Sequence, residues 1–218
     1  MVRTRYINEL ENLKNEIILY SATVEKMLMD MKVIIEEAPD SSDLADKLSV
    51  LEAKDEEICG FSRDIETLCL KIMSTQQPVA KDLRFVSSTL NIIRNIEKIG
   101  GHVIEIAGLL KFTNALENFT EEILDMCLST KKMLKSAIDA FITGDLEESY
   151  KVIASDDKID DLFSHIMNEV ATKIGEKKED ALRLIDIIQI AKYFERIGDN
   201  AEAIADWSVF SITAKHYE

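Results

Sequence analysis

Apolar residues recur at every third or fourth position along most of this chain, which is the period of a helix that buries one face. The first such stretch runs from Tyr6 to Ile35, and its apolar positions are Leu10, Leu13, Ile17, Tyr20, Val24, Met27, Met31 and Ile34. Pro39 and the polar run 40–42 follow it and are expected to end the helix. Two more stretches cover about 44–73 and 81–111. Pro78 separates them, because a proline disfavours helical backbone in the residue before it.

The same succession of stretches and stops begins again in the second half of the chain. Asn118 and Glu121 have the spacing of a capping box, which predicts the start of a helix. Gly144 suits the end of that helix, and Asp145 suits the cap of the next. That next helix is expected to end near Gly175, and the last runs from about residue 180 to near the C-terminus. We therefore expect roughly six helices joined by short connections.

The second half of the sequence repeats the first. Residues 95–101 (Asn-Ile-Glu-Lys-Ile-Gly-Gly) match 193–199 (Tyr-Phe-Glu-Arg-Ile-Gly-Asp), and residues 106–107 match 204–205 (both Ile-Ala) at the same offset. Upstream, residues 55–61 match 156–162. The sequence thus predicts an all-α protein of two tandem three-helix bundle repeats with pseudo-two-fold symmetry, the first in 1–113 and the second in 114–218.

Composition and charge narrow the class of protein. Hydrophobic residues make up 46% of the chain, whereas Gly (7) and Pro (2) are scarce, which disfavours a β-rich fold with its many turns. The formal net charge of −15 repels nucleic acid phosphates, so no nucleic acid partner is expected. The sparse cysteines form no Cys-x-x-Cys pair, and the N-terminus carries no apolar signal core. No uncharged apolar stretch is long enough to cross a bilayer, so we expect a cytoplasmic protein that does not span a membrane.

Two pairs of acidic residues stand one helical turn apart in the second repeat. Glu195 and Asp199 lie on one helix face, and Asp156 and Asp160 share a face of the preceding helix. Like charges at this spacing destabilise a helix unless something neutralises them. If the two helices pack antiparallel, the four carboxylates converge and would bind a hard cation through oxygen ligands. A glycine between the acids, Gly198, would let a backbone or a ligand come close.

The sequence leaves alternatives open at these positions. The acids also fit a solvated surface, and Glu195 is within reach of Lys192 or Arg196 as an ion-pair partner. Asp157 and Asp161 have the same spacing as Asp156 and Asp160, so the sequence does not decide which pair faces inward.

The first repeat has lost one acid from each pair. Its matching positions are Asp55 with Cys59, and Glu97 with Gly101. A cysteine can bind a soft metal, although a lone helical cysteine more often serves as a small buried apolar residue, which we favour for Cys59.

The signatures of several enzyme classes are missing from the sequence. None of His102, His165 and His216 follows a glutamate by three residues, so the Glu-x-x-His motif of ferritin-like di-iron enzymes is absent. There is no P-loop and no nucleophile elbow. We therefore expect a protein that is not an enzyme, rather than a hydrolase or oxidase built on the acidic residues.

Several motifs together resemble those of the PhoU family of phosphate-signalling regulators. They are the run Gln-Gln-Pro-Val-Ala-Lys-Asp-Leu-Arg at 76–84, Glu-Lys-Ile-Gly at 97–100, Phe-Glu-Arg-Ile-Gly-Asp at 194–199, and Ile-Ala at 204–205. The resemblance covers nearly the whole chain, including its duplicated layout. It implies a cytoplasmic, dimeric, non-enzymatic negative regulator of the phosphate-starvation response and of phosphate uptake. Such a regulator would connect a sensor histidine kinase with the ATPase subunit of a phosphate ABC transporter.

The resemblance also implies a metal site. Some members of the family bind iron or other metal clusters through acidic x-x-x-acidic motifs from two neighbouring helices, and here the matching residues are Asp156, Asp160, Glu195 and Asp199. Asp55 and Glu97 match in the first repeat, where Cys59 and Gly101 depart from the pattern, so the expected site there is weak. The alternative function is a helical metal-binding or metal-storage protein whose role is the di- or trivalent cation itself.

Overall fold

The computed structural model describes residues 2–37, 44–111, 116–176 and 181–217, and within them it contains helices and no strand. The helices of the first half are α1 (Val2–Glu37), α2 (Leu44–Glu52), α3 (Asp55–Gln76) and α4 (Ala80–Leu110). A short 3-10 helix, η1 (Leu116–Asn118), leads to α5 (Thr120–Thr143), α6 (Leu146–Glu176) and α7 (Ala181–Thr213). This confirms the all-α prediction, with six long helices and the short α2 and η1 in addition.

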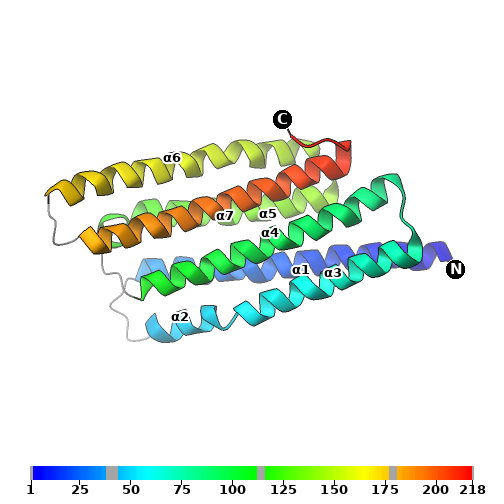
Figure 1. The fold of residues 1–218 in the computed structure, drawn as a ribbon, viewed down its shortest axis with the longest axis horizontal. Helices are drawn as coiled ribbons and strands as arrows, with labels where there is room; N and C mark the ends of the chain where they lie inside the picture. Colours follow the sequence, from blue (N-terminus) through cyan, green and yellow to red (C-terminus); the bar gives the residue numbers. More distant parts are fainter. Residues whose placement is uncertain (1, 38–43, 112–115, 177–180, 218) are drawn as a thin grey trace.

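The helices form two three-helix units that lie side by side. In the first unit α1, α3 and α4 pack on one another, with α2 against α1 and α4, and in the second unit α5, α6 and α7 do the same. The two units meet along α4 and α7 and along α1 and α5 (Figure 1). The predicted boundary at 113/114 falls outside the described residues, as does the helix stop expected at Pro39 and 40–42.

The apolar stripes found in the sequence are the buried faces of these helices. The α1 positions from Leu13 to Ile34 are at most 5% exposed, and the matching stripe of α5 is equally buried. Polar contacts between the units are few and specific. The Arg84 Nε atom donates to the carbonyl of Ser211 at 3.1 Å, and the Cys127 thiol donates to the carbonyl of Leu28 at 3.4 Å. Apolar burial therefore provides most of the packing.

The predicted second helix is two helices. α2 ends at Glu52, α3 begins at Asp55, and a turn at Ala53 and Lys54 separates them. The Lys54 amide donates to the carbonyl of Leu51, three residues back, which tightens the backbone locally. No glycine or proline marks this place, so the apolar period alone could not reveal it.

The predicted helix ends had mixed outcomes. Gly144 adopts a left-handed conformation (φ 73°) after α5, and the amide of Glu148 donates to Asp145 Oδ1 at 3.0 Å at the start of α6, as expected. The capping box at Asn118 is wrong, because α5 begins at Thr120 and Asn118 lies within η1. The Thr120 hydroxyl instead donates to the carbonyl of Leu116 at 2.8 Å.

None of the described helices is long and apolar enough to span a membrane.

The two predicted caps give a matched test of helix stability. Asp145→Ala removes the side-chain acceptor at the start of α6 and is expected to lower the free energy of unfolding by about 1 kcal/mol. Asn118→Ala removes no cap and is expected to change it by less than about half that amount. Urea denaturation followed by circular dichroism measures both, and equal losses in the two variants would contradict the assignment.

Candidate functional site

Three carboxylates of the second repeat come together between α6 and α7. Asp156 and Asp160 on α6 and Asp199 on α7 can each place one oxygen within 4.8 Å of the others. Asp156 is buried, with 8% of its surface exposed, whereas Asp160 and Asp199 face solvent. Asp157 and Asp161 are both exposed and do not join this group, so the structure selects the Asp156/Asp160 register that the sequence had left open.

Gly198 determines how closely the two helices approach at this point. A Cβ atom at position 198 would lie 2.6 Å from Asp156 Oδ1 and 3.4 Å from a methyl group of Ile159. Any side chain there would have to displace the Asp156 carboxyl. The glycine that interrupts the acidic face of α7 therefore makes room for a buried side-chain carboxylate, rather than for the backbone or ligand that the sequence suggested.

The carboxylates raise one another's proton affinity. Burial, followed by the charges of Glu202, Asp199, Asp160 and Glu195, raises the pKa of Asp156 to about 7 from an ordinary value of 3.8. The pKa of Asp199 is raised by burial and by Glu195, and that of Glu202 by burial and by Asp199 and Asp160. At neutral pH this site therefore tends to take up a proton or another positive charge.

Two buried carboxylate oxygens, one in this group and one on a neighbouring residue of α7, have no hydrogen-bond partner among the described residues. They are Asp156 Oδ1 and Glu195 Oε2. A buried carboxylate oxygen without a donor is costly, and native structures rarely leave one. A cation bound between α6 and α7 would supply the missing partner, so the donors present fit a hard metal ion with oxygen ligands.

Glu195 occupies a different place from the other three predicted ligands. Its Oε1 atom accepts a hydrogen bond from the Lys192 ammonium one turn earlier on α7, which is the ion pair that the sequence offered as an alternative. It adds negative charge near Asp156 but does not belong to the group of three converging carboxylates.

Glu202 is a member of the acidic site that the sequence analysis missed. It lies three residues after Asp199 on α7, and each raises the proton affinity of Asp156. The comparison of repeats passed over it because the matching residue of the first repeat is Ile104. The spacing from Asp199 was the available signal, since residues three apart share a helix face.

The first repeat brings its remaining candidates into a smaller cluster. The Cys59 thiol donates to Glu97 Oε1 at 3.5 Å, and Asp55 is exposed at the start of α3. Cys59 is only partly buried, so our interpretation of it as a small core residue is wrong. The Tyr20 hydroxyl is fully buried with no partner among the described residues, and burial together with the charge of Glu97 raises its pKa. Gly101 adds no side chain, so this arrangement holds fewer oxygen ligands than the second repeat.

Comparison with known proteins places both repeats in one family. The family model described as "PhoU domain" matches residues 17–110 and 123–208. Among curated proteins, the chain is 29% identical over 221 residues to a phosphate-specific transport system accessory protein PhoU homolog of Clostridium acetobutylicum, covering 100% of this chain and 99% of that protein. It is 30% identical over 206 residues to a PhoU homolog 1 of Methanothermobacter thermautotrophicus, covering 87% of this chain and 94% of that protein.

Solved structures show the same fold. The crystal structure of PhoU from Pseudomonas aeruginosa matches with a TM-score of 0.86 and 24% identity, over 96% of this chain and 100% of that one. The phosphate transport system regulatory protein PhoU from Streptococcus pneumoniae matches with a TM-score of 0.86 and 20% identity, over 98% of this chain and 99% of that one. With two matched domains, relatives similar along their whole length and the same duplicated helical fold, this chain belongs to the PhoU family.

Proposed function

We propose that this protein is a non-enzymatic accessory of phosphate transport that represses the phosphate-starvation response when phosphate is plentiful. The observation that carries the proposal is the match of both three-helix repeats to PhoU domains, together with full-length relatives named as accessory proteins of phosphate-specific transport. Its partners would be the ATPase subunit of a phosphate ABC transporter and a sensor histidine kinase. It would act as a homodimer in the cytoplasm.

The duplicated fold suits an adaptor with two partners. Each repeat presents an outer surface of long helices, and the two surfaces share a backbone frame while differing in their side chains. Related but unequal surfaces allow one protein to bind two different partners, because specificity depends on the side chains that each surface presents.

A deletion strain tests the regulatory role. Loss of the gene is expected to raise transcription from phosphate-starvation promoters in phosphate-rich medium, because the link that restrains the kinase is missing. A promoter–reporter fusion measures the effect, and the wild-type gene supplied in trans should restore repression. Unchanged reporter activity in the deletion strain would refute the proposal.

Metal binding in the second repeat is the second candidate function. The specific observation in its favour is the unpartnered Asp156 Oδ1 atom, on a side chain that converges with those of Asp160 and Asp199. Iron or another di- or trivalent cation bound there would neutralise the charge that now raises the pKa of Asp156. Such an ion would serve either as a structural part of the regulator or, in the alternative function, as stored cargo.

Substitutions in the two repeats test the metal site. Asp156→Asn/Asp199→Asn removes two converging carboxylates and is expected to abolish most bound metal, as measured by elemental analysis of protein equilibrated with ferric or manganous ion. Glu195→Gln is expected to have a smaller effect, because one of its oxygens is held by Lys192. The matched control is Asp55→Asn/Glu97→Gln in the first repeat, which should leave the metal content unchanged. Loss of metal in the control variant would show that the ion binds in the first repeat and that our assignment to the second is wrong.

The raised pKa of Asp156 also predicts how the stability of the metal-free protein depends on pH. Between about pH 4 and pH 7 the folded protein keeps a proton on Asp156 that the unfolded chain has released, since the pKa is about 7 in the fold and 3.8 otherwise. Stability should therefore be greatest below this range and fall as the pH rises through it. Asp156→Asn removes the charge and should stabilise the metal-free protein at pH 8 by on the order of 2 kcal/mol.

Chemical denaturation of wild type and Asp156→Asn across this pH range, in the presence of a chelator, measures the difference. The variant should be nearly equal to wild type at low pH and more stable at high pH. A variant that is less stable than wild type at pH 8 would show that the Asp156 carboxylate is already neutralised within the protein.

A further inference from the structure

A trough opens between α5 and α6 in the second repeat, with a volume of about 440 Å³. Its floor is apolar, because Met133 and Val152 are both buried there. Serine side chains line it from both helices, and their small size leaves space between the helix backbones. Three lysines, Lys132, Lys151 and Lys158, stand along it.

The lysines make this trough an exception in a strongly acidic protein. The chain carries 41 Asp and Glu against 26 Lys and Arg, yet the trough lining contains three lysines and a single acid, Glu148. A partner with negative charge is repelled by most of the surface. At this place three lysine ammonium groups can pair with its carboxylates.

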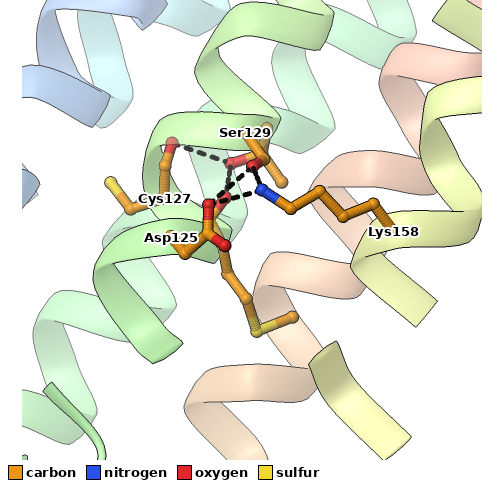
Figure 2. A network of polar contacts seen from close by, with 6 residues as sticks. Asp125, Cys127, Ser129 and Lys158 are labelled. Atoms are coloured by element: carbon orange, nitrogen blue, oxygen red, sulfur yellow. Dashed lines mark hydrogen bonds and ion pairs between the residues drawn. The ribbon is translucent and has the colours of Figure 1, made fainter. Parts of the chain in front are cut away.

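The lysines remain available to a ligand. Lys158 donates to Asp125 Oδ1 at 2.6 Å and to the Ser129 hydroxyl at 3.1 Å (Figure 2). Lys151 pairs with Glu147 at 2.8 Å and with Glu148 at 3.9 Å, and Lys132 forms no ion pair within the described ranges. These three pairs are on the surface, where ion pairs contribute little and exchange readily for other carboxylates.

The first repeat contains the same trough with different chemistry. The alignment that matches Asp55 with Asp156 also matches Val50 with Lys151 and Leu51 with Val152, and the buried stripes of α1 and α5 match Val33 with Lys132. A smaller trough of about 250 Å³ occurs at these very positions, lined in part by Val33, Val50 and Leu51. The trough is therefore a feature of the repeat, while the lysines at two of its positions belong to the second repeat only.

We propose that the trough between α5 and α6 binds an acidic segment of a partner protein, with aliphatic side chains on its floor and carboxylates paired with the lysines. Lys151 and Lys158 are seven residues apart, or about 10 Å along the helix axis. Two carboxylates two turns apart on a helix have the same separation. A single small anion is a poorer fit as the ligand, because it has no apolar surface to pack on Met133 and Val152. Nucleic acid is disfavoured by the net charge of −15. The proposal goes beyond the proposed role in phosphate regulation and does not depend on the metal site.

The test uses the full-length protein and a fluorescein-labelled amphipathic helical peptide with glutamates two turns apart and leucines between them. Fluorescence anisotropy should show binding that weakens as ionic strength rises. Lys132→Val/Lys151→Val gives the second trough the side chains of the first and should weaken binding roughly tenfold. The matched control is Lys135→Val on the same helix, outside the trough, which should leave the affinity unchanged.

The reciprocal exchange keeps the test independent of damage to the fold. Val33→Lys/Val50→Lys/Glu57→Lys gives the first repeat all three lysines of the second, because Glu57 matches Lys158. It should create a second peptide site, which appears as a doubled stoichiometry, and circular dichroism checks that every variant remains helical. The proposal is overturned if the peptide does not bind wild type or if Lys132→Val/Lys151→Val binds it equally well. It is likewise overturned if free inorganic phosphate displaces the peptide as a stoichiometric competitor. It is also overturned if sedimentation shows that the trough lysines hold a second copy of this chain instead of a partner segment.

Discussion

The packing of α7 is the constraint on which the rest of the structure depends. This helix lies against α4, α5 and α6 at once, so apolar residues surround much of it, and its buried residues include the small Ala191, Gly198, Ala201 and Ala205. Ser208 shows what this enclosure requires of a buried polar group, namely a hydrogen-bond partner. It is fully buried, and it is accommodated because its hydroxyl accepts a hydrogen bond from Ser149 at 2.9 Å.

The acidic site is one place where the described residues do not supply a partner for buried polar atoms. Gly198 lets the Asp156 carboxyl reach the backbone of α7, and the charges of Asp199 and Glu202 lie on the same helix. A buried carboxylate with acidic neighbours is unstable as an anion, so it holds a proton or binds a cation. The energetic conflict is local, and the surrounding helices are well packed. Conflicts of this kind in an otherwise consistent fold are expected at functional sites rather than in the scaffold.

The two repeats show how one backbone frame supports different chemistry. Gly100 and Gly198 occupy matching positions, but the first faces a methyl group of Ile58 and the second faces the carboxyl of Asp156. Cys59 with Glu97 replaces a cluster of carboxylates, and exposed valines replace lysines in the outer trough. In both cases the helix packing is retained, because the substituted side chains lie at the edges of the core. Duplication thus preserved the fold while the solvent-accessible positions diverged.

The sequence by itself determined the helices, the repeat, the cap at Asp145 and the helix stop at Gly144, because each depends on spacing and on residues close together in the chain. It also indicated which helices carry the acidic pairs. Only the tertiary structure decided that α2 and α3 are separate, that Asp156 rather than Asp157 faces inward, that Glu195 is held by Lys192, and that Glu202 joins the site. Those outcomes depend on how the helix faces meet, and a shift of one residue rotates a helical side chain by about 100°. The periodicity of a single helix does not determine which of two adjacent acids its neighbour will cover.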